Sequence, residues 1–390
     1  MKRSRFSRRS SGLSPEAEQL VWLASGLSES GCRAEDRFWE TRLATQIEAL
    51  LDEGDEETLN AAMDHLFTAN PRAYDELADA LESLSESSIN AQTGDDLLLI
   101  AAPVMAWSRF SIPAMTLAAP QLASLRVHLQ AHVFADGVKL ALADFMFSPD
   151  QLPQGYCDTR RFALALGEAA RAGHDLKVSR ENMPETVRFL SDVRYLLAAV
   201  VVPAGQPLFR WQENDSSREQ ALAQWRAQGG AVIATLMPGC ACDIVLPEAY
   251  FAASRQADRE SRPYSLRASV AFLTTTLEVP PGELRAVIAP YHDKQLEEYR
   301  IAFTQTDSDK VVHGVVWPLL GAEDETSEIA QQIETALREC GLDQIQHLEN
   351  RFPLEYCDDC GSPMYPSPEG ESVHAELPEE KAESIPRHLH

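Results

Sequence analysis

Apolar residues recur at every third or fourth position in the first part of the chain, which is the spacing of one buried helix face. Ser14 and Pro15 form an N-cap and first-turn pair in front of this pattern. The apolar positions of the predicted helices are Leu20, Leu23, Ala24 and Leu27, then Phe38, Leu43, Ile47 and Leu50, then Leu59, Met63, Leu66 and Phe67, and last Tyr74, Leu77 and Leu81. Because the connections are short, residues 14–92 are predicted to form helical hairpins.

The pattern changes after Gly94, where continuous apolar runs of strand length alternate with helical stretches. Strands are predicted at 97–105, 138–147, 195–202, 208–211, 244–246, 284–289, 299–304, 311–317 and 344–349. Helices are predicted at 121–135, 161–172, 219–234, 248–260, 266–276 and 327–340. The chain is therefore predicted to be an α+β protein, with an α/β domain over 93–215 and a second α/β domain over 216–366 after its helical N-terminal region.

The two α/β segments each contain a short stretch of similar pattern. Leu99–Pro103 is followed by Arg109–Ile112, and Val287–Pro290 is followed by Tyr299–Ile301. Each is an apolar strand that breaks at Ala-Pro and is followed by a second strand. One interpretation is a weak internal duplication, in which the cleft between two similar domains is the natural binding site. The other is chance, since strand-proline-strand layouts are common.

The charge of the chain limits its partners. Its 390 residues carry a formal net charge of −26 at pH 7. An acidic surface repels nucleic acid phosphates and anionic lipids, so the body of the protein is expected to bind neither. Disordered tails are predicted at both ends, a basic one over 1–13 and an acidic one over 367–390. The basic residues at 2–9 are the one expected route to RNA or an acidic partner, or else they form a free arm.

The N-terminal segment and the lengths of the apolar runs indicate where in the cell the protein is expected. Met1 to Arg9 is basic but no continuous apolar stretch follows it, and no run of about 18 apolar residues indicates a membrane span. We therefore expect a cytoplasmic protein, in which the seven cysteines stay thiols unless a metal or a catalytic cycle uses them. The sequence identifies neither a protein partner nor an oligomeric state.

Four cysteines come as two tight pairs, Cys240 with Cys242 and Cys357 with Cys360. Two such pairs could complete a tetrahedral sulfur site for a structural zinc ion, with His374 as a possible substitute for one thiolate. The second pair precedes a glycine, which permits the tight turn of a metal-binding knuckle. A zinc ion there would fix the C-terminal segment to the body of the protein.

The same thiols allow a different chemistry. Each pair, Cys240/Cys242 or Cys357/Cys360, could close a disulfide, so a redox switch or an enzyme using these thiols is the alternative function. Together the pairs resemble the zinc centre of the redox-switched holdase chaperones. Those proteins carry the pairs close together, whereas here they are far apart, so the resemblance implies only four-thiolate metal chemistry.

No catalytic signature is found. The phosphate-binding, dinucleotide-binding, nucleophile-elbow and EF-hand patterns do not occur, so whether the protein is an enzyme stays open. His128 and His132 are one helical turn apart, but Leu129 stands where a metalloprotease needs glutamate. The leading hypothesis is therefore a non-catalytic cytosolic binding or regulatory protein that a cysteine-ligated zinc stabilises.

Four short segments are typical of one known family. They are Glu35–Trp39, Pro238–Asp243, His313–Pro318 and Arg351–Pro353 leading into the second cysteine pair. With these segments the chain resembles, over nearly its full length, an uncharacterised bacterial family known as a domain of unknown function. The resemblance implies a protein of a single family rather than a fusion, and it implies no activity, cofactor or substrate.

Overall fold

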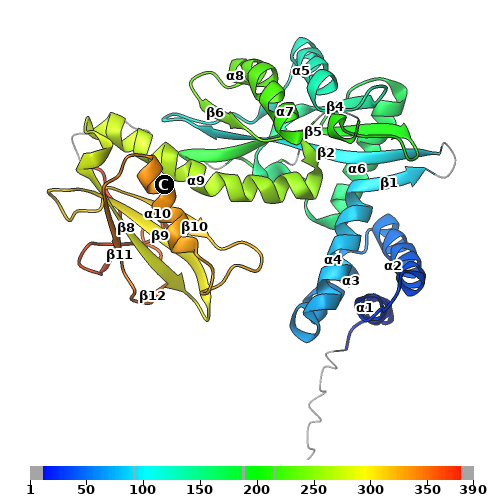
Figure 1. Ribbon diagram of the computed structural model, residues 1–390, viewed down its shortest axis with the longest axis horizontal. Coiled ribbons are helices and arrows are strands. Elements are labelled where there is room, and N and C mark those ends of the chain that lie inside the picture. The colour runs from blue at the N-terminus through cyan, green and yellow to red at the C-terminus, as the bar shows by residue number, and fades with distance from the viewer. Residues whose placement is uncertain (1–11, 91–93, 182, 187–188, 214–216, 379–390) are drawn as a thin grey trace, which may run out of the picture.

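The structure is a computed structural model that describes residues 12–90, 94–181, 183–186, 189–213 and 217–378. It consists of a helical N-terminal region, a first sheet with helices on both faces and a second sheet beside it (Figure 1). This confirms the predicted α+β class. The predicted basic contact segment at 2–9 lies outside the described residues. Within the described part of the chain, no helix combines the length and the apolar character needed to cross a lipid bilayer.

The helical region has the hairpin arrangement that the apolar spacing predicts. Its helices are α1 (Pro15–Ser28), α2 (Arg33–Glu53), α3 (Glu56–Ala69) and α4 (Pro71–Glu86). Side chains of Ser14, Asp55 and Asn70 accept hydrogen bonds from the first turns of α1, α3 and α4. Phe38 and Phe67 were predicted on buried faces but are exposed, because they lie beside the stripe rather than within it.

The first sheet has the order β1-β2-β5-β4-β3, with β6 and β7 also pairing with β2. Its strands are β1 (Ser87–Asn90), β2 (Asp95–Trp107), β3 (Met115–Thr116), β4 (Lys139–Phe147), β5 (Ser191–Pro203), β6 (Ala241–Ile244) and β7 (Glu248–Ala249). One face packs on α5 (Ala119–His132), the π-helical turn Trp225–Gly229 and α8 (Gly230–Leu236). The π-helical turn and α8 follow directly after α7 (Arg218–Gln224). The other face packs on α6 (Gly155–Ala172) and α9 (Tyr250–Leu277). Alternate residues of β2 enter the two cores, as strand geometry requires.

The second sheet has the order β10-β9-β8-β11, with β12 also pairing with β8. Its strands are β8 (Leu284–His292), β9 (Leu296–Gln305), β10 (His313–Pro318), β11 (Gln344–His347) and β12 (Phe352–Pro353). The C-terminal half of α9 and helix α10 (Ile329–Glu339) cover one face. On the other face lies a small two-stranded sheet, β13 (Tyr365–Pro366) with β14 (Ser372–Val373). Residues 367–378, assigned above to the acidic tail, are therefore part of the fold.

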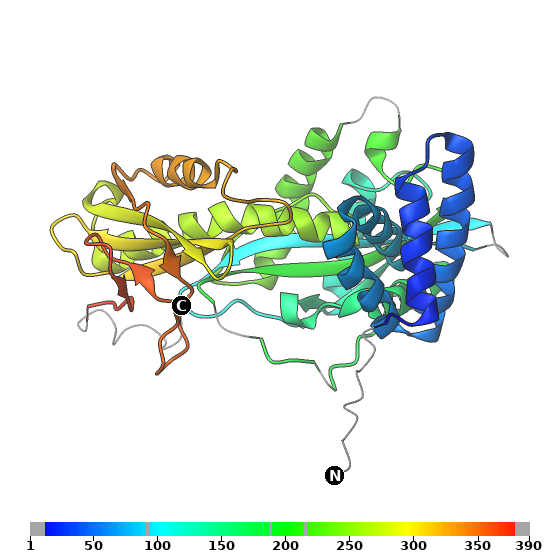
Figure 2. The ribbon, with the colours of Figure 1, turned by 90° about the horizontal axis from the view of Figure 1, so that it is seen from below.

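Helix α9 joins the two sheets. Tyr250 and Ala257 in its first half belong to the core of the first sheet, and Leu266 and Phe272 in its second half belong to the core of the second. The sequence predicted two helices here, at 248–260 and 266–276, but Pro263 lies inside one continuous helix. Proline removes one helix hydrogen bond and crowds the preceding turn. Figures 1 and 2 show α9 as one helix that runs along both sheets. Burial on both sides of the proline outweighs the cost of including it.

Two predicted strands are absent, and this affects the duplication hypothesis. Residues 208–211 contain a 3₁₀ turn (Arg210–Gln212) instead of a strand, and 109–112 form no strand after β2. The remaining 3₁₀ turns are Pro149–Gln151 and Pro281–Glu283. Strand β2 pairs with β5, far along the chain, whereas β8 pairs with the next strand β9. The two sheets thus connect their strands differently, and their topology gives a duplication no support.

Carboxylates attach the helical region to the first sheet. Glu56 of α3 accepts hydrogen bonds from the main-chain N–H groups of Tyr156 and Cys157, at the start of α6. Glu86 of α4 accepts one from the N–H of Phe251, at the start of α9. Negative charge is favoured at a helix N-terminus, because the first N–H groups there lack helical partners. Burial nevertheless raises the pKa of Glu86 to about 7.

We predict that Gly314→Ala destabilises the second sheet, because a Cβ there would lie 2.2 Å from the ring of Tyr365. Tyr365 is buried and belongs to β13, so its ring would have to move away from β10. Overpacking of this kind costs about 1–3 kcal/mol. Urea unfolding measures the loss. Gly282→Ala is the control, since its Cβ would meet only an ordinary contact at 3.6 Å, and equal stability of the two variants would contradict the prediction.

Candidate metal centre

Cys357 and Cys360 lie in a tight hairpin between β12 and β13. The N–H of Cys357 donates to the carbonyl of Ser362, and the N–H of Gly361 donates to the carbonyl of Cys357, both at 2.8 Å. Gly361 has a φ of 70°, in the left-handed region that favours glycine. This backbone turns both sulfur atoms toward one side, as the knuckle predicted from the sequence requires.

His374 reaches the same point from the end of β14. Its Nε2 lies 3.3 Å from the Sγ of Cys360, and the ligand atoms of Cys357, Cys360 and His374 all lie within 4.8 Å of one another. Ligand atoms around a tetrahedral zinc are roughly 3.5–3.8 Å apart, given bonds of about 2.3 Å to sulfur and about 2.0 Å to nitrogen. The three side chains therefore form a group that could hold a metal ion.

A carboxylate lies behind the imidazole. The Nδ1 of His374 is 3.7 Å from a carboxylate oxygen of Glu376. The main chain of Glu376 is itself fixed, because its N–H donates to the carbonyl of Val311 just before β10. Metal-binding histidines commonly present their second nitrogen to a carboxylate, which fixes the ring and strengthens the ligand. The surroundings of His374 thus suit a metal ligand.

Arg300 of β9 connects the hairpin to the second sheet. Its side chain is fully buried, and one guanidinium nitrogen donates to the carbonyls of Glu355 and Met364, on the two arms of the hairpin. Another nitrogen donates to the carboxylate of Glu298 at 2.6 Å. The guanidinium also lies 5.0 Å from the centre of the Tyr356 ring. One buried cation therefore fixes both arms that carry the thiols.

The environment of Cys360 favours its thiolate. Hydrogen bonds with Ser362 lower the pKa of Cys360 to about 7; the bond with its hydroxyl has the largest effect, and the bond with its main chain the next largest. Contacts with His374 and Cys357 act in the same direction. The thiolate is the form that binds metal ions, so the hairpin is prepared for a cation.

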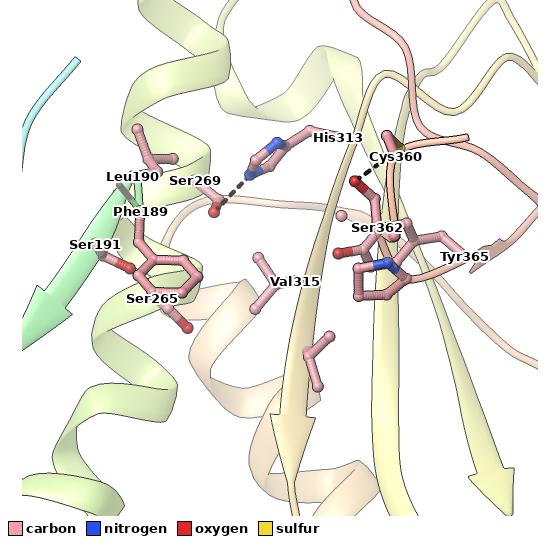
Figure 3. Close-up of a pocket in the computed structure, with 14 residues that line it drawn as sticks. Phe189, Leu190, Ser191, Ser265, Ser269, His313, Val315, Cys360, Ser362 and Tyr365 are labelled. Atoms are coloured by element: carbon pink, nitrogen blue, oxygen red, sulfur yellow. Dashed lines mark hydrogen bonds between the residues drawn. The ribbon is translucent and has the colours of Figure 1, made fainter. Parts of the chain in front are cut away.

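The hairpin also forms one wall of a cavity. The cavity has a volume of 670 Å³ and lies between α9, β10, the start of β5 and the hairpin. Figure 3 shows Phe189 and Ser265 on one side, and Cys360 and Ser362 on the other. The side chain of His313 points toward Ser269 of α9.

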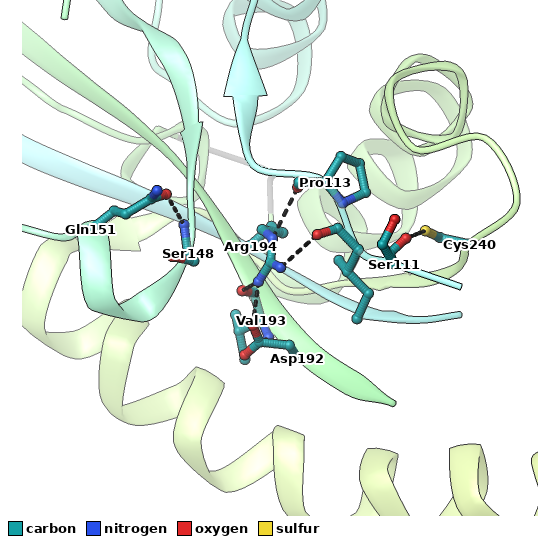
Figure 4. Close-up of polar contacts among 9 residues, drawn as sticks. Ser111, Pro113, Ser148, Gln151, Asp192, Val193, Arg194 and Cys240 are labelled. Atoms are coloured by element: carbon teal, nitrogen blue, oxygen red, sulfur yellow. Dashed lines mark hydrogen bonds and ion pairs between the residues drawn. The ribbon is translucent and has the colours of Figure 1, made fainter. Parts of the chain in front are cut away.

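The structure does not bring Cys240 and Cys242 to this group. They lie at the start of β6, and the sulfur of Cys240 contacts the carbonyl of Ser111 at 3.6 Å (Figure 4). Arg194 fixes the chain beside that carbonyl, because its guanidinium donates to the carbonyls of Ile112 and Pro113. Among the described residues, the group that could hold a metal contains Cys357, Cys360 and His374 alone.

Strand geometry explains the position of the first pair. Residues two apart in a strand share one face, and here that face packs against the core of the first sheet. Burial raises the pKa of Cys240 and raises that of Cys242 to about 11. The two half-buried cysteines therefore pack as small apolar side chains against this core.

Sequence reasoning missed Arg300 and His313. The available signal for Arg300 was a charged residue inside an otherwise apolar strand, since fully buried arginines are rare unless paired. His313 is buried at the start of β10; the sequence marked it only as the first residue of the family-typical segment His313–Pro318, with no chemical role. His128 and His132 stack on α5 with ring centres 6.1 Å apart, and among the described residues they join no group that could hold a metal.

The fold and this hairpin define an α+β protein with a candidate thiolate-imidazole metal centre. The chain belongs to DUF2863, a family described as a protein of unknown function, whose model matches residues 5–388. This confirms the resemblance to a domain of unknown function. No curated protein matches the chain, and no solved structure does.

We predict that Arg300→Met weakens both the fold and metal binding. The change leaves Glu298 and two main-chain carbonyls without their buried partner, and breaking such a pair costs about 3–5 kcal/mol. Chemical unfolding and zinc titration measure the two effects. Arg338→Met is the control, because Arg338 forms an exposed pair within α10, worth roughly 0.5 kcal/mol. Similar losses of stability and zinc affinity in both variants would contradict the role of Arg300 in fixing the hairpin.

In metal-free protein, alkylation of Cys360 by iodoacetamide is expected to reach half its maximal rate near pH 7, because its pKa is about 7. Cys242, with a pKa of about 11, should stay unmodified near neutral pH. The lowered pKa also predicts that the metal-free fold gains stability as the pH rises from about 7 toward the usual thiol value of 9.0. Peptide mass spectrometry measures the alkylation. Ser362→Ala should move the pH midpoint of Cys360 alkylation upward. An unchanged midpoint would show that the Ser362 hydroxyl does not lower the pKa of Cys360.

Proposed function

We propose that the protein is a non-catalytic binding or regulatory protein in which a zinc ion, held by Cys357, Cys360 and His374, stabilises the C-terminal segment. The observation that carries this proposal is the meeting of two thiols and one imidazole within 4.8 Å. Two sulfur ligands and one nitrogen ligand favour zinc over magnesium or calcium, which take oxygen ligands.

The proposed zinc ion has a clear structural task. The segment from β12 to β14 contains short strands and few core residues, and its buried aromatic anchors are Phe352 and Tyr365. The metal would tie the hairpin to His374, and so close this segment on itself over the second sheet. Metal binding that accompanies folding contributes directly to stability. Because thiolate ligands persist best in reducing surroundings, the proposal includes a cytoplasmic location.

A thiol switch is the second candidate. The sulfurs of Cys357 and Cys360 are close, and Cys360 is exposed. With hydrogen peroxide as oxidant, the two thiols would lose two electrons and two protons, forming one S–S bond and two water molecules. Oxidation would remove two of the three metal ligands, so this function competes with the zinc site for the same atoms.

Elemental analysis of the full chain, purified under reducing conditions, tests the zinc proposal. We expect about one zinc per chain in the wild type, as for a structural site. Cys357→Ser, Cys360→Ser and His374→Ala should each lose most of it. Cys240→Ser and Cys242→Ser are matched controls that should keep it, because the structure places them in the first sheet.

Three outcomes would count against the proposal. A wild-type protein that takes up no zinc, even when refolded with it, would reject the metal site. Equal loss in the Cys240 and Cys242 variants would favour the four-thiolate site instead. A metal-free wild type that gains a Cys357–Cys360 disulfide with dilute peroxide, detected by peptide mass, would favour the switch.

A further inference from the structure

The cavity beside the metal centre is formed by parts of both halves of the molecule. Ser191, the first residue of β5, comes from the first sheet, whereas Leu190 just before it packs in the core of the second sheet. Strand β10 and the cysteine hairpin also come from the second sheet. Helix α9 runs along it and belongs to both cores. Ligand sites are common at such junctions, and 670 Å³ is within the usual range of about 300–1,000 Å³.

Apart from Cys360, whose thiolate would be neutralised by the proposed zinc ion, the described wall of the cavity carries no ionic side chain. It is mainly apolar, with a few hydroxyl groups and one imidazole, and no aspartate, glutamate, lysine or arginine is among the described residues that line it. This contrasts with a chain whose formal net charge is −26. A charged ligand would lose its hydration here without gaining an opposite charge, which is costly. The wall therefore favours an uncharged ligand.

His313 and Ser269 supply polar contacts. The Nε2 of His313 is 3.0 Å from the hydroxyl of Ser269, and the imidazole packs against the ring of Phe272. A serine bonded to a histidine is also the start of a catalytic pair. Ser269 is only 2% exposed and lies inside α9, where main-chain N–H groups are used by the helix and cannot stabilise an oxyanion. The pair therefore suits recognition rather than catalysis.

We propose that this cavity binds a small, uncharged and mainly apolar molecule that carries a hydroxyl or carbonyl group, and that the metal centre controls its affinity. The coupling rests on the proposed zinc site. Residues 360–362 line the cavity and also contain a metal ligand, so one strip of backbone serves both sites. Metal binding fixes this strip, and two ligands that favour the same arrangement strengthen each other.

Fluorescence titration with prodan, an uncharged naphthalene ketone, tests the proposal on the full chain. We expect saturable binding to the zinc-loaded wild type. Ser265→Trp fills the cavity from α9 and should weaken binding by about tenfold or more, through a steric clash. Ser261→Trp is the matched control, since both hydroxyls donate to a carbonyl three residues earlier in the helix, and only Ser265 lines the cavity.

Each result decides one part of the proposal. Absence of saturable binding to the wild type, or equal affinity of the two tryptophan variants, would overturn the cavity as a ligand site. If thermal melting shows that Ser265→Trp is unfolded, Ser265→Leu replaces it. Cys357→Ser, shown by elemental analysis to lack zinc, should bind prodan about tenfold more weakly. Unchanged affinity there would overturn the coupling, while the zinc content of the wild type judges the metal site separately.

Discussion

The architecture depends on the burial of helix α9 against two sheets at once. Tyr250 and Ala257 pack on the first sheet, and Leu266 and Phe272 pack on the second, so a single rigid element fixes the relative position of both cores. A helix that is buried on more than one side tolerates Pro263 in its interior, because packing supplies more stabilisation than one lost hydrogen bond removes. The cavity beside α9 is a consequence of this shared helix, since two separate domains would leave an open gap there.

The C-terminal segment follows a different principle, in which polar contacts replace a core. Its strands are very short, and it buries few apolar side chains against the second sheet, chiefly Phe352 and Tyr365. Arg300 compensates by donating to both arms of the cysteine hairpin from a fully buried position. Buried ion pairs gain little net stability but enforce one geometry, because any other arrangement leaves a charge unpaired. That property is useful where three metal ligands from two turns must meet.

The helices and most strands could be predicted from the sequence because their signals are local. An N-cap such as Ser14 and an apolar stripe act within a few turns, and the tight turn at Gly361 needs only its neighbours. The partners of distant residues could not be predicted in this way. The hypothesis that Cys240 joins Cys360 required a long-range contact, and spacing along the chain carries no information about such contacts. The gap predicted between the helices at 248–260 and 266–276 is wrong for the same reason, since only tertiary burial keeps α9 continuous through Pro263.

The candidate metal group and the cavity are adjacent and share Cys360. A tetrahedral zinc ion takes four ligands, and the described residues that meet here supply three, so one position is left for water or for a donor outside this group. The strip 360–362 lines the cavity and contains one residue of the candidate metal group, so any movement of it changes both. In the proposed zinc-bound state the cavity wall would carry no net charge although the protein is acidic. We therefore expect it to favour apolar molecules, which gain from burial, over charged ones, which lose hydration. In this proposal, ligand affinity and metal content would be linked through that strip of backbone.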